Sequence, residues 1–189
     1  MTLVRRLLAR AVDQHGYVTT ADAVEEGATP MALVMLAHRG TVDHVDRGLY
    51  RFAELAGDPL AQYQEALLRL PGAVLSHDTA LEIEGLADVN PRGVHVTVER
   101  GRRIRKQLPK WLVVHEDALD PIDIGERDGL EVVTPARAII DAIKDDLGER
   151  FVYQAIETAR RRNLLTTPEE TRIDAALAQK RVAYRAVEA

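Results

Sequence analysis

Apolar residues at the start of the chain recur with the period of short helices. Over residues 3–12 they stand three and four positions apart, which predicts a helix with one buried face that ends near Gly16. Thr19 or Thr20 suits the cap of a second helix, and Gly27 suits its end.

A third helix is predicted at residues 30–39, because proline suits its first turn and Gly40 follows its last. Two extended runs, residues 41–45 and 49–52, come next, and the short segment between them predicts a tight hairpin. Three short helices followed by a hairpin are typical of a winged helix-turn-helix. We expect this DNA-binding domain to occupy residues 1–56.

The rest of the chain, residues 57–189, alternates helical and extended patterns and predicts a mixed α/β domain that ends in helices. The fold class is therefore α+β. Threonine or aspartate followed by proline marks three helix starts, and Glu170 stands where it would complete a capping box in the last one. Helices are expected at residues 59–70, 77–83, 135–144, 150–161 and 168–180, strands at 94–98 and 111–115, and a hairpin between 122 and 133.

Composition narrows the class of protein. The chain has no cysteine, which excludes disulfides, thiolate zinc sites and a cysteine nucleophile. Its first residues lack the uninterrupted apolar core of a signal peptide, and no run reaches transmembrane length, so we expect a cytoplasmic protein without a membrane partner. A formal net charge of -5 means that any contact with nucleic acid must come from a local basic patch.

The third helix carries the candidate DNA-reading face. In a helix-turn-helix this helix enters the major groove, and with Leu33 and Leu36 toward the core its other side chains point outward. Only Arg39 and His38 suit guanine, while the small and apolar side chains suit a thymine methyl group. The candidate DNA contacts, including two arginines of the hairpin, are Thr29, Met31, Ala32, Met35, His38, Arg39, Arg47 and Arg51. The alternative is a winged helix that serves only as a protein-interaction module.

The densest positive charge lies between two predicted strands. Such a patch attracts phosphate or an acidic partner surface, and the alternative is a solvated helix face. Its residues are Arg100, Arg102, Arg103, Arg105, Lys106 and Lys110. Three further arginines, residues 160–162, end a predicted helix, where cations oppose the negative end of the helix dipole.

No motif in the sequence predicts an enzyme. Ser76, His77 and Asp78 are adjacent and cannot adopt the geometry of a catalytic triad, so we interpret them as helix-capping residues. The six histidines are scattered, and we interpret the acidic residues between 116 and 123 as solvated loop charges. A Walker loop, an HExxH motif and a kinase catalytic loop are missing from the sequence. We therefore expect no catalytic residue, no metal ligand and no cofactor.

Two stretches resemble the AbiEi-type antitoxins of bacterial type IV toxin-antitoxin systems, which include mycobacterial and other actinobacterial members. The first is Arg39-Gly40-Thr41-Val42 followed by Arg47-Gly48-Leu49-Tyr50. The second resembles the core of the family's second domain in order and spacing, and comprises residues 73–77, 79–81, 85–86, 94–98 and 133–137 with Asp141. The resemblance spans nearly the whole chain and is weakest at residues 31–35, because relatives carry more arginine in this helix.

This resemblance implies a non-enzymatic antitoxin, encoded beside a nucleotidyltransferase-like toxin, that represses the promoter they share. Its expected partners are the operator DNA, bound by the N-terminal domain, and the toxin, with which no stable complex is needed. A positively charged surface of the second domain is linked to antitoxic activity in the family, which points to the basic residues between 100 and 110. The alternatives are an antitoxin that promotes phosphorylation of the toxin, and one that binds the toxin directly with little DNA binding.

Overall fold

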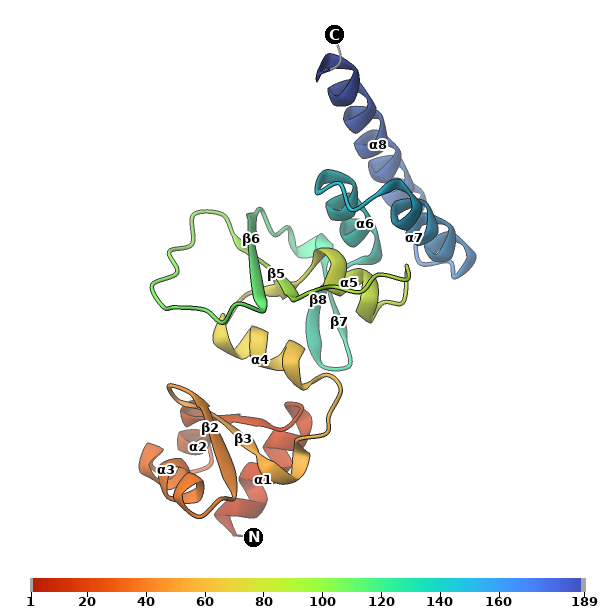
Figure 1. Ribbon diagram of the computed structural model, residues 1–189. Helices are drawn as coiled ribbons and strands as arrows, with labels where there is room; N and C mark the ends of the chain where they lie inside the picture. The colour runs from red at the N-terminus through yellow and green to blue at the C-terminus, as the bar shows by residue number, and fades with distance from the viewer. Residues whose placement is uncertain (1, 188–189) are drawn as a thin grey trace. The chain divides into compact units, whose positions relative to one another are not determined.

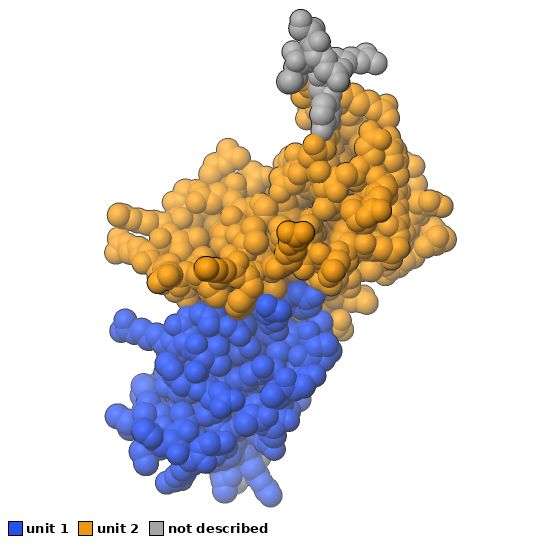
Figure 2. Space-filling view, in the orientation of Figure 1, with its two compact units in different colours: residues 1–71 blue, residues 72–189 orange. Residues whose placement is uncertain are grey.

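A computed structural model of the chain describes residues 2–187 (Figure 1). The chain divides into two compact units, residues 1–71 and 72–189, which Figure 2 shows in blue and orange. The helices and strands together confirm the α+β class. Within the described residues, no helix is both long enough and apolar enough to cross a membrane.

The first unit contains the three helices and the hairpin predicted for the start of the chain. Its strands form an antiparallel sheet in the order β1-β3-β2. The elements are α1 (Leu3–Asp13), β1 (Tyr17–Thr19), α2 (Thr20–Glu25), α3 (Pro30–His38), β2 (Val42–Asp46), β3 (Leu49–Phe52), a short 3-10 turn (Ala53–Leu55) and α4 (Ala61–Arg69).

Local capping and one apolar core explain this arrangement. Thr19 caps α2 in a reciprocal box, since its hydroxyl accepts the Asp22 N–H while the Asp22 carboxylate accepts the Thr19 N–H. Leu7, Leu33 and Phe52 are fully buried in a single cluster to which all three helices and the sheet contribute. The face of α3 that holds Leu33 is therefore fixed toward the core, and its opposite face is turned outward.

Helix α4 belongs to the first unit, although the sequence placed it at the start of a second domain beginning at residue 57. Tyr17 of β1 donates a 2.7 Å hydrogen bond to Glu65 on this helix. Arg69 pairs with Glu65 at 2.7 Å and also with Asp46 at the end of β2. Because these contacts join α4 to the first sheet, the division between the units falls after Pro71 and not after residue 56.

The turn of the β2–β3 hairpin is held against the start of α2. Gly48 has a φ of +72°, and a Cβ atom there would lie 2.9 Å from the Thr20 hydroxyl oxygen. The Thr20 N–H donates to the Gly48 carbonyl at 2.9 Å. Only glycine both adopts this positive φ without strain and leaves room for the Thr20 hydroxyl. Gly48 therefore sets the position of its exposed neighbour Arg47.

The second unit is a mixed five-stranded sheet with helices packed on it. The strand order is β6-β5-β4-β8-β7, with β5–β6 and β4–β8 parallel and the other pairs antiparallel. The elements are β4 (Val74–Leu75), α5 (His77–Ile83), β5 (Val94–Glu99), β6 (Leu112–Asp117), a 3-10 turn (Pro121–Asp123), β7 (Ile124–Arg127), β8 (Leu130–Val133), α6 (Pro135–Lys144), α7 (Glu149–Arg161) and α8 (Thr167–Val187). In Figure 1, α6, α7 and α8 gather on one side of this sheet.

Of the three predicted helix starts, the one at Thr134 is present and two are shifted, since α4 begins at Ala61, two residues after Pro59. Thr134 caps α6 through the Arg137 N–H, with proline at the first helical position. In α8 the capping box lies one residue earlier than expected, because Glu169 accepts from both the N–H and the hydroxyl of Thr166. Glu170 instead forms an ion pair with Arg160 at 2.7 Å.

The parallel strands β5 and β6 are joined by a long irregular loop, residues 100–111, where a helix is the usual connection. The loop projects from the sheet in Figure 1. Gly93 lets the bases of the two strands approach, since a Cβ atom there would lie 2.4 Å from the Trp111 carbonyl oxygen. The sequence offered a solvated helix face as one interpretation of this segment, and the structure has no helix there.

A buried arginine joins α6 to the segment that follows β6. Arg137, only 4% exposed, donates to Asp141 at 2.7 Å, to Asp117 at 2.8 Å and to the Ala118 carbonyl at 3.0 Å. Asp123, also buried, lies 3.6 Å from the same guanidinium and pairs with an arginine of α8. The Arg137 guanidinium therefore holds together α6, the end of β6 and the 3-10 turn that contains Asp123.

Replacing this charge should unfold the second unit readily. In Arg137→Met, the buried carboxylates lose their common partner, and the free energy of unfolding should fall by about 3–5 kcal/mol. Chemical denaturation measures this change. Arg127→Met is the matched control, because Arg127 is half exposed and its pair with Asp128 is open to solvent, so its effect should stay below about 1 kcal/mol. Similar losses in both variants would contradict the central role of Arg137.

Candidate nucleic-acid interface and histidine cluster

The outward face of α3 is apolar at its N-terminal end and basic at its C-terminal end. Met31 is 62% exposed and Met35 is 46% exposed. His38 and Arg39 are exposed at the end of the helix. Leu33 and Leu36 are buried, as predicted, and the remaining candidates, Thr29 and Ala32, are exposed and half-buried respectively.

The two hairpin arginines proposed as DNA contacts differ in their surroundings. Arg47 is exposed at the turn, and its side chain forms no ion pair within residues 2–183, the part of the chain whose side chains are described. Arg51 lies on the central strand β3, where its guanidinium donates to the Ala56 carbonyl at 2.6 Å and lies 5.5 Å from the centre of the Tyr17 ring. Arg51 thus stabilises the unit internally, which leaves Arg47 as the more accessible cation.

The other charges of the first unit largely neutralise one another. Arg6 pairs with Glu26 at 2.9 Å, and Arg10 pairs with both Asp22 and Glu25. These contacts join α1 to α2. Because both arginines are paired within the unit, they are less available to bind a phosphate backbone. Positive charge at α3 and the hairpin is therefore local and small, in agreement with the net charge of -5.

The six cations between β5 and β6 lie on the irregular loop. Contacts of the first loop residues with the end of β6 hold the base of this loop. Arg100 is 73% exposed and pairs with Asp117 at 2.9 Å. The Gly101 N–H donates to Glu116 at 3.3 Å. Arg103 and Arg105, farther along the loop, are exposed, as is Lys110. The loop presents its positive charge to solvent at the edge of the sheet where β6 lies.

Two of the three arginines at residues 160–162 have structural contacts. Arg160 pairs with Glu170 on α8. Arg162 donates at 2.5 Å to the Glu84 carbonyl, which lies at the C-terminal end of α5. The predicted contact between cations and the C-terminal end of a helix is present. Arg160 and Arg161 lie in the last turn of their own helix, α7, and Arg162 binds the C-terminal end of α5.

Of the acidic residues at the end of β6 and after it, Glu116 and Asp120 are exposed, as expected from sequence, but Asp117 and Asp123 are not solvated loop charges. Asp123 is only 4% exposed and lies within the Arg137 network. Burial alone would raise the pKa of Asp117, but the Ala118 N–H, Lys144 and Arg137 lower it on balance. Asp120 accepts the Ile122 N–H and caps the short turn that follows. These carboxylates position elements, which the sequence pattern did not reveal.

Three histidines that are scattered along the sequence meet in the second unit. His77 begins α5, His95 lies on β5 and His115 lies on β6. The His77 and His115 rings stack with their centres 3.5 Å apart, and His95 Nδ1 lies 3.1 Å from His115 Nε2. Asp145, at the end of α6, lies 3.4 Å from His77 Nε2 and 3.6 Å from His115 Nδ1. We call these four residues the histidine cluster.

Burial keeps the stacked rings neutral. It lowers the pKa of His77 to about 4, although the charge of Asp145 opposes this change. Burial and the neighbouring His77 also lower the pKa of His115 to about 4. Both rings therefore carry a free nitrogen lone pair at neutral pH, and together with Asp145 they offer three ligand-type atoms within 4.8 Å of one another.

Ser76 contributes to this cluster and not to a helix cap. It occupies the N-cap position of α5, yet its hydroxyl makes no capping bond. It lies 2.9 Å from His77 Nδ1 and accepts a 2.8 Å hydrogen bond from Thr97. Because Ser76 is fully buried, it has no access to a substrate as a nucleophile, which agrees with the rejection of a catalytic triad.

The cluster could not have been found from spacing alone. In the parallel pairing of β5 and β6, His115 stands opposite Thr97, so that His95 and His115 share one face of the sheet. The only local signal was a histidine in each of two neighbouring strands. The strand register and the placement of α5 decide that they meet.

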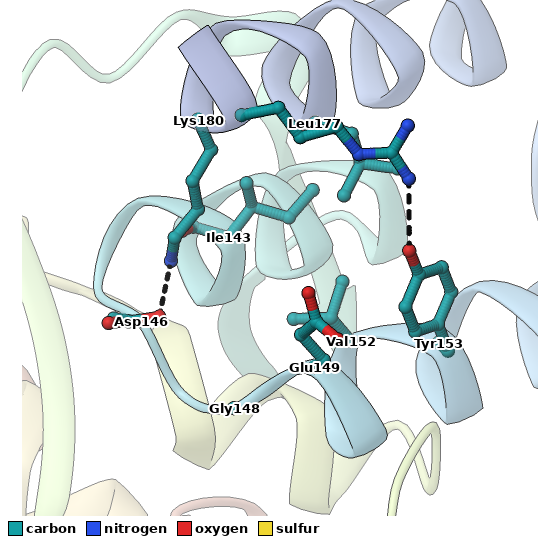
Figure 3. A pocket seen from close by; sticks show the side chains of 9 residues that line it. Ile143, Asp146, Gly148, Glu149, Val152, Tyr153, Leu177 and Lys180 are labelled. Carbon is teal, nitrogen blue, oxygen red and sulfur yellow. Dashed lines mark hydrogen bonds and ion pairs between the residues drawn. The ribbon is translucent and has the colours of Figure 1, made fainter. Parts of the chain in front are cut away.

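A cavity of about 300 Å³ lies between α6, α7 and α8 (Figure 3). Lys180 pairs with Asp146 at 2.8 Å, and Arg181 donates to the Tyr153 hydroxyl at 3.2 Å. Ile143 and Leu177 form part of its apolar lining. Four of the polar side chains that line it are thus paired with each other, and none of the predicted site residues lies in it.

Comparison with known protein families gives a match within the first unit. Residues 5–53 match the family profile described as "Transcriptional regulator, AbiEi antitoxin". The match confirms the resemblance to AbiEi-type antitoxins over the first stretch, residues 39–50, and the second stretch lies outside it. The matched segment runs from α1 to the end of the β2–β3 hairpin and includes all the candidate DNA contacts. No curated protein matches the chain.

Among solved structures, the chain resembles the "Crystal structure of RV2827C protein from Mycobacterium tuberculosis". The TM-score is 0.54 at 16% sequence identity, and the alignment covers 95% of this chain and 78% of that chain. At this identity the likeness concerns the fold alone.

The neutral histidines predict a loss of stability in acid. Their pKa values near 4 in the folded chain lie below the value of about 6.5 expected after unfolding, so the unfolded chain binds more protons between these limits. The stabilisation is complete above about pH 6.5 and is lost as the pH falls toward 4. The charged or titratable groups that act on the two rings are His95, Arg137, Asp141, Lys144 and Asp145.

Thermal unfolding at pH 7 and pH 5, with a chelator present, measures this effect. From pH 7 to pH 5, the melting temperature of His115→Gln should decrease by less than that of the original chain. His38→Gln, which changes an exposed histidine of the first unit, should lose as much as the original chain. An equal loss in all three proteins would show that His115 does not contribute.

Proposed function

We propose that this chain is an antitoxin that represses its own promoter through a winged helix-turn-helix and counteracts a nucleotidyltransferase-like toxin in the cytoplasm. The observation that carries the proposal is the match of residues 5–53 to the AbiEi regulator profile. The sequence resemblance of the second unit to the same antitoxins supports it.

The surface of the first unit supports DNA as a partner. Helix α3 turns Met31, Met35 and Arg39 outward, and the hairpin turn beside it carries Arg47. Methionine side chains suit thymine methyl groups, while arginine suits guanine or phosphate. With so few cations, the affinity should depend on a small number of phosphate contacts and on shape.

The hairpin is built to hold Arg47 in one place. Its turn is fixed to α2 through Gly48 and Thr20, and the end of β2 is fixed to α4 by the pair between Asp46 and Arg69. A wing supported on two sides costs little entropy on binding, so that a single arginine at its tip can be an effective phosphate contact. Arg51 has an internal role, and we do not assign it to phosphate.

The basic loop between β5 and β6 supports an antitoxic surface in the second unit. Arg103, Arg105 and Lys110 are exposed, and the loop lacks the regular structure that would bury them. A cluster of exposed cations favours an acidic protein surface or a nucleic acid. The loop is therefore the surface that we assign to the antagonism of the toxin.

A second candidate function is direct binding of the toxin with little DNA binding. The exposed Met31 and Met35 favour it, because flexible apolar side chains also suit a protein interface. Purification of a tagged toxin would retain the chain in this case. Phosphorylation of the toxin promoted by the chain is the remaining alternative, and a mass increase of one phosphate on the co-expressed toxin would identify it.

A gel-shift titration tests the repressor role. The full chain should bind the DNA upstream of its own gene in preference to an unrelated fragment, and the affinity should fall as salt rises. In Arg47→Ala the slope of the logarithm of affinity against the logarithm of salt should shrink by about one, because one phosphate contact is lost. Arg127→Ala, a loss of one positive charge in the second unit, should leave the slope unchanged. Failure to prefer its own promoter at any salt concentration would refute the repressor role.

Co-expression with the neighbouring toxin tests the basic loop. The double variant Arg103→Gln and Arg105→Gln should lose protection against the toxin while it retains promoter binding. Arg127→Gln with Arg161→Gln removes two exposed charges elsewhere on the unit and should still protect. Full protection by the loop variant, at equal protein levels, would refute the assignment.

A further inference from the structure

The histidine cluster brings ligand-type atoms together from three separate elements. His77 comes from the start of α5, His115 from β6 and Asp145 from the end of α6. The Asp145 carboxylate lies 3.4 Å and 3.6 Å from the two ring nitrogens that face it. A tetrahedral ion with ligands at 2.0–2.1 Å needs donor atoms about 3.3 Å apart, so both of these separations are already close to the required value.

The far nitrogen of each ring has a partner that can accept its proton. His77 Nδ1 lies 2.9 Å from the Ser76 hydroxyl oxygen, and His115 Nε2 lies 3.1 Å from His95 Nδ1. When both rings donate in these directions, the lone pairs of His77 Nε2 and His115 Nδ1 face Asp145. Histidines that bind metal ions almost always have such a partner on the opposite nitrogen, which fixes the tautomer and the ring orientation.

A buried carboxylate oxygen lies beside the cluster, and a positive charge at the cluster would stabilise it. Asp141 is 1% exposed, and its Oδ1 atom accepts from Arg137. Its Oδ2 atom has no hydrogen-bond partner among the described residues and lies 3.9 Å from His77 Nδ1. An unpartnered carboxylate oxygen in this position is costly next to neutral rings, and a cation at the cluster would reduce the cost.

The backbone at His77 is also unusual. Its φ of +53° lies in the left-handed region, which residues other than glycine rarely adopt. Such strain persists where the surroundings fix it, often at ligand-binding sites. Here it directs the first side chain of α5 onto the face shared by His95 and His115.

Binding an ion requires one local adjustment. The two rings are stacked within 14° of parallel, and they must rotate apart so that both lone pairs converge on one point. Asp145 is 49% exposed at the end of its helix and is free to follow. Two imidazoles and one carboxylate leave at least one coordination position for water, on the exposed side of Asp145.

We propose that His77, His115 and Asp145 bind a divalent first-row transition-metal ion of the zinc type, with Ser76 and His95 orienting the two imidazoles. Imidazole with a carboxylate suits these ions better than it suits calcium or magnesium, which prefer oxygen ligands alone. The proposal replaces the expectation from sequence that the chain has no metal ligand, and it is independent of the proposed antitoxin function.

Isothermal titration of the chelator-treated full chain with Zn²⁺ tests the site. One ion should bind per chain, and Asp145→Ala should abolish this binding. This residue is half exposed, so its replacement should leave the fold intact, which circular dichroism verifies. His115→Ala should have the same effect on binding, and His38→Ala, an exposed histidine outside the cluster, should bind like the original chain.

The variant His95→Gln tests whether His95 orients the His115 ring or binds the ion itself. Loss of a residue that only orients a ligand should weaken binding about 10- to 100-fold without abolishing it. Co²⁺ provides a second readout, because its visible absorption on binding reports a low coordination number. Zinc binding that is absent, or that is unchanged in both Asp145→Ala and His115→Ala, would overturn the proposal.

Discussion

The buried guanidinium of Arg137 is the interaction on which the second unit depends. It binds carboxylates from α6 and from the end of β6, and it approaches a third at the turn before β7. A buried cation that lost these partners would be strongly unfavourable, and the carboxylates would be equally unfavourable without the cation. The network therefore fixes the direction of α6 relative to the sheet. Since Asp141 and Asp145 lie on and just after this helix, it also fixes where their side chains meet the histidines.

The first unit relies on a different device. One apolar core, to which α1, α2, α3 and the sheet all contribute, leaves the outer face of α3 exposed, and glycine at position 48 holds the hairpin turn against α2. The positive charges of α1 are used within the unit, to bind the acidic side of α2. The exposed face of α3 and the hairpin turn is consequently short and mostly apolar, with a few fixed cations, and it lies within the segment that matches the AbiEi antitoxin regulator profile.

The two chemically distinct features of the second unit arise from one topological fact. Strands β5 and β6 are parallel neighbours, so the chain must cross from the end of one to the start of the other. The crossing is made by the basic loop, which leaves its cations in solvent. The same pairing brings His95 and His115 onto one face, beneath the start of α5. An exposed basic loop and a candidate metal site are therefore built on the same pair of strands.

The sequence by itself determined the local elements: the capped helices of the first unit, the hairpin with its glycine, the strands at residues 94–99 and 112–117, and the Thr134-Pro135 start of α6. These depend on contacts between residues a few positions apart, which a single sequence displays. Only the tertiary structure decided that α4 packs with the first sheet, that Asp123 is buried, and that three scattered histidines meet Asp145. Such meetings depend on strand register and on helix placement. In the histidine cluster they join residues 18 to 68 positions apart, as in the pairs of His77 with His95 and with Asp145. No local pattern encodes them, because a shift of one residue in register would turn His115 to the other face of the sheet.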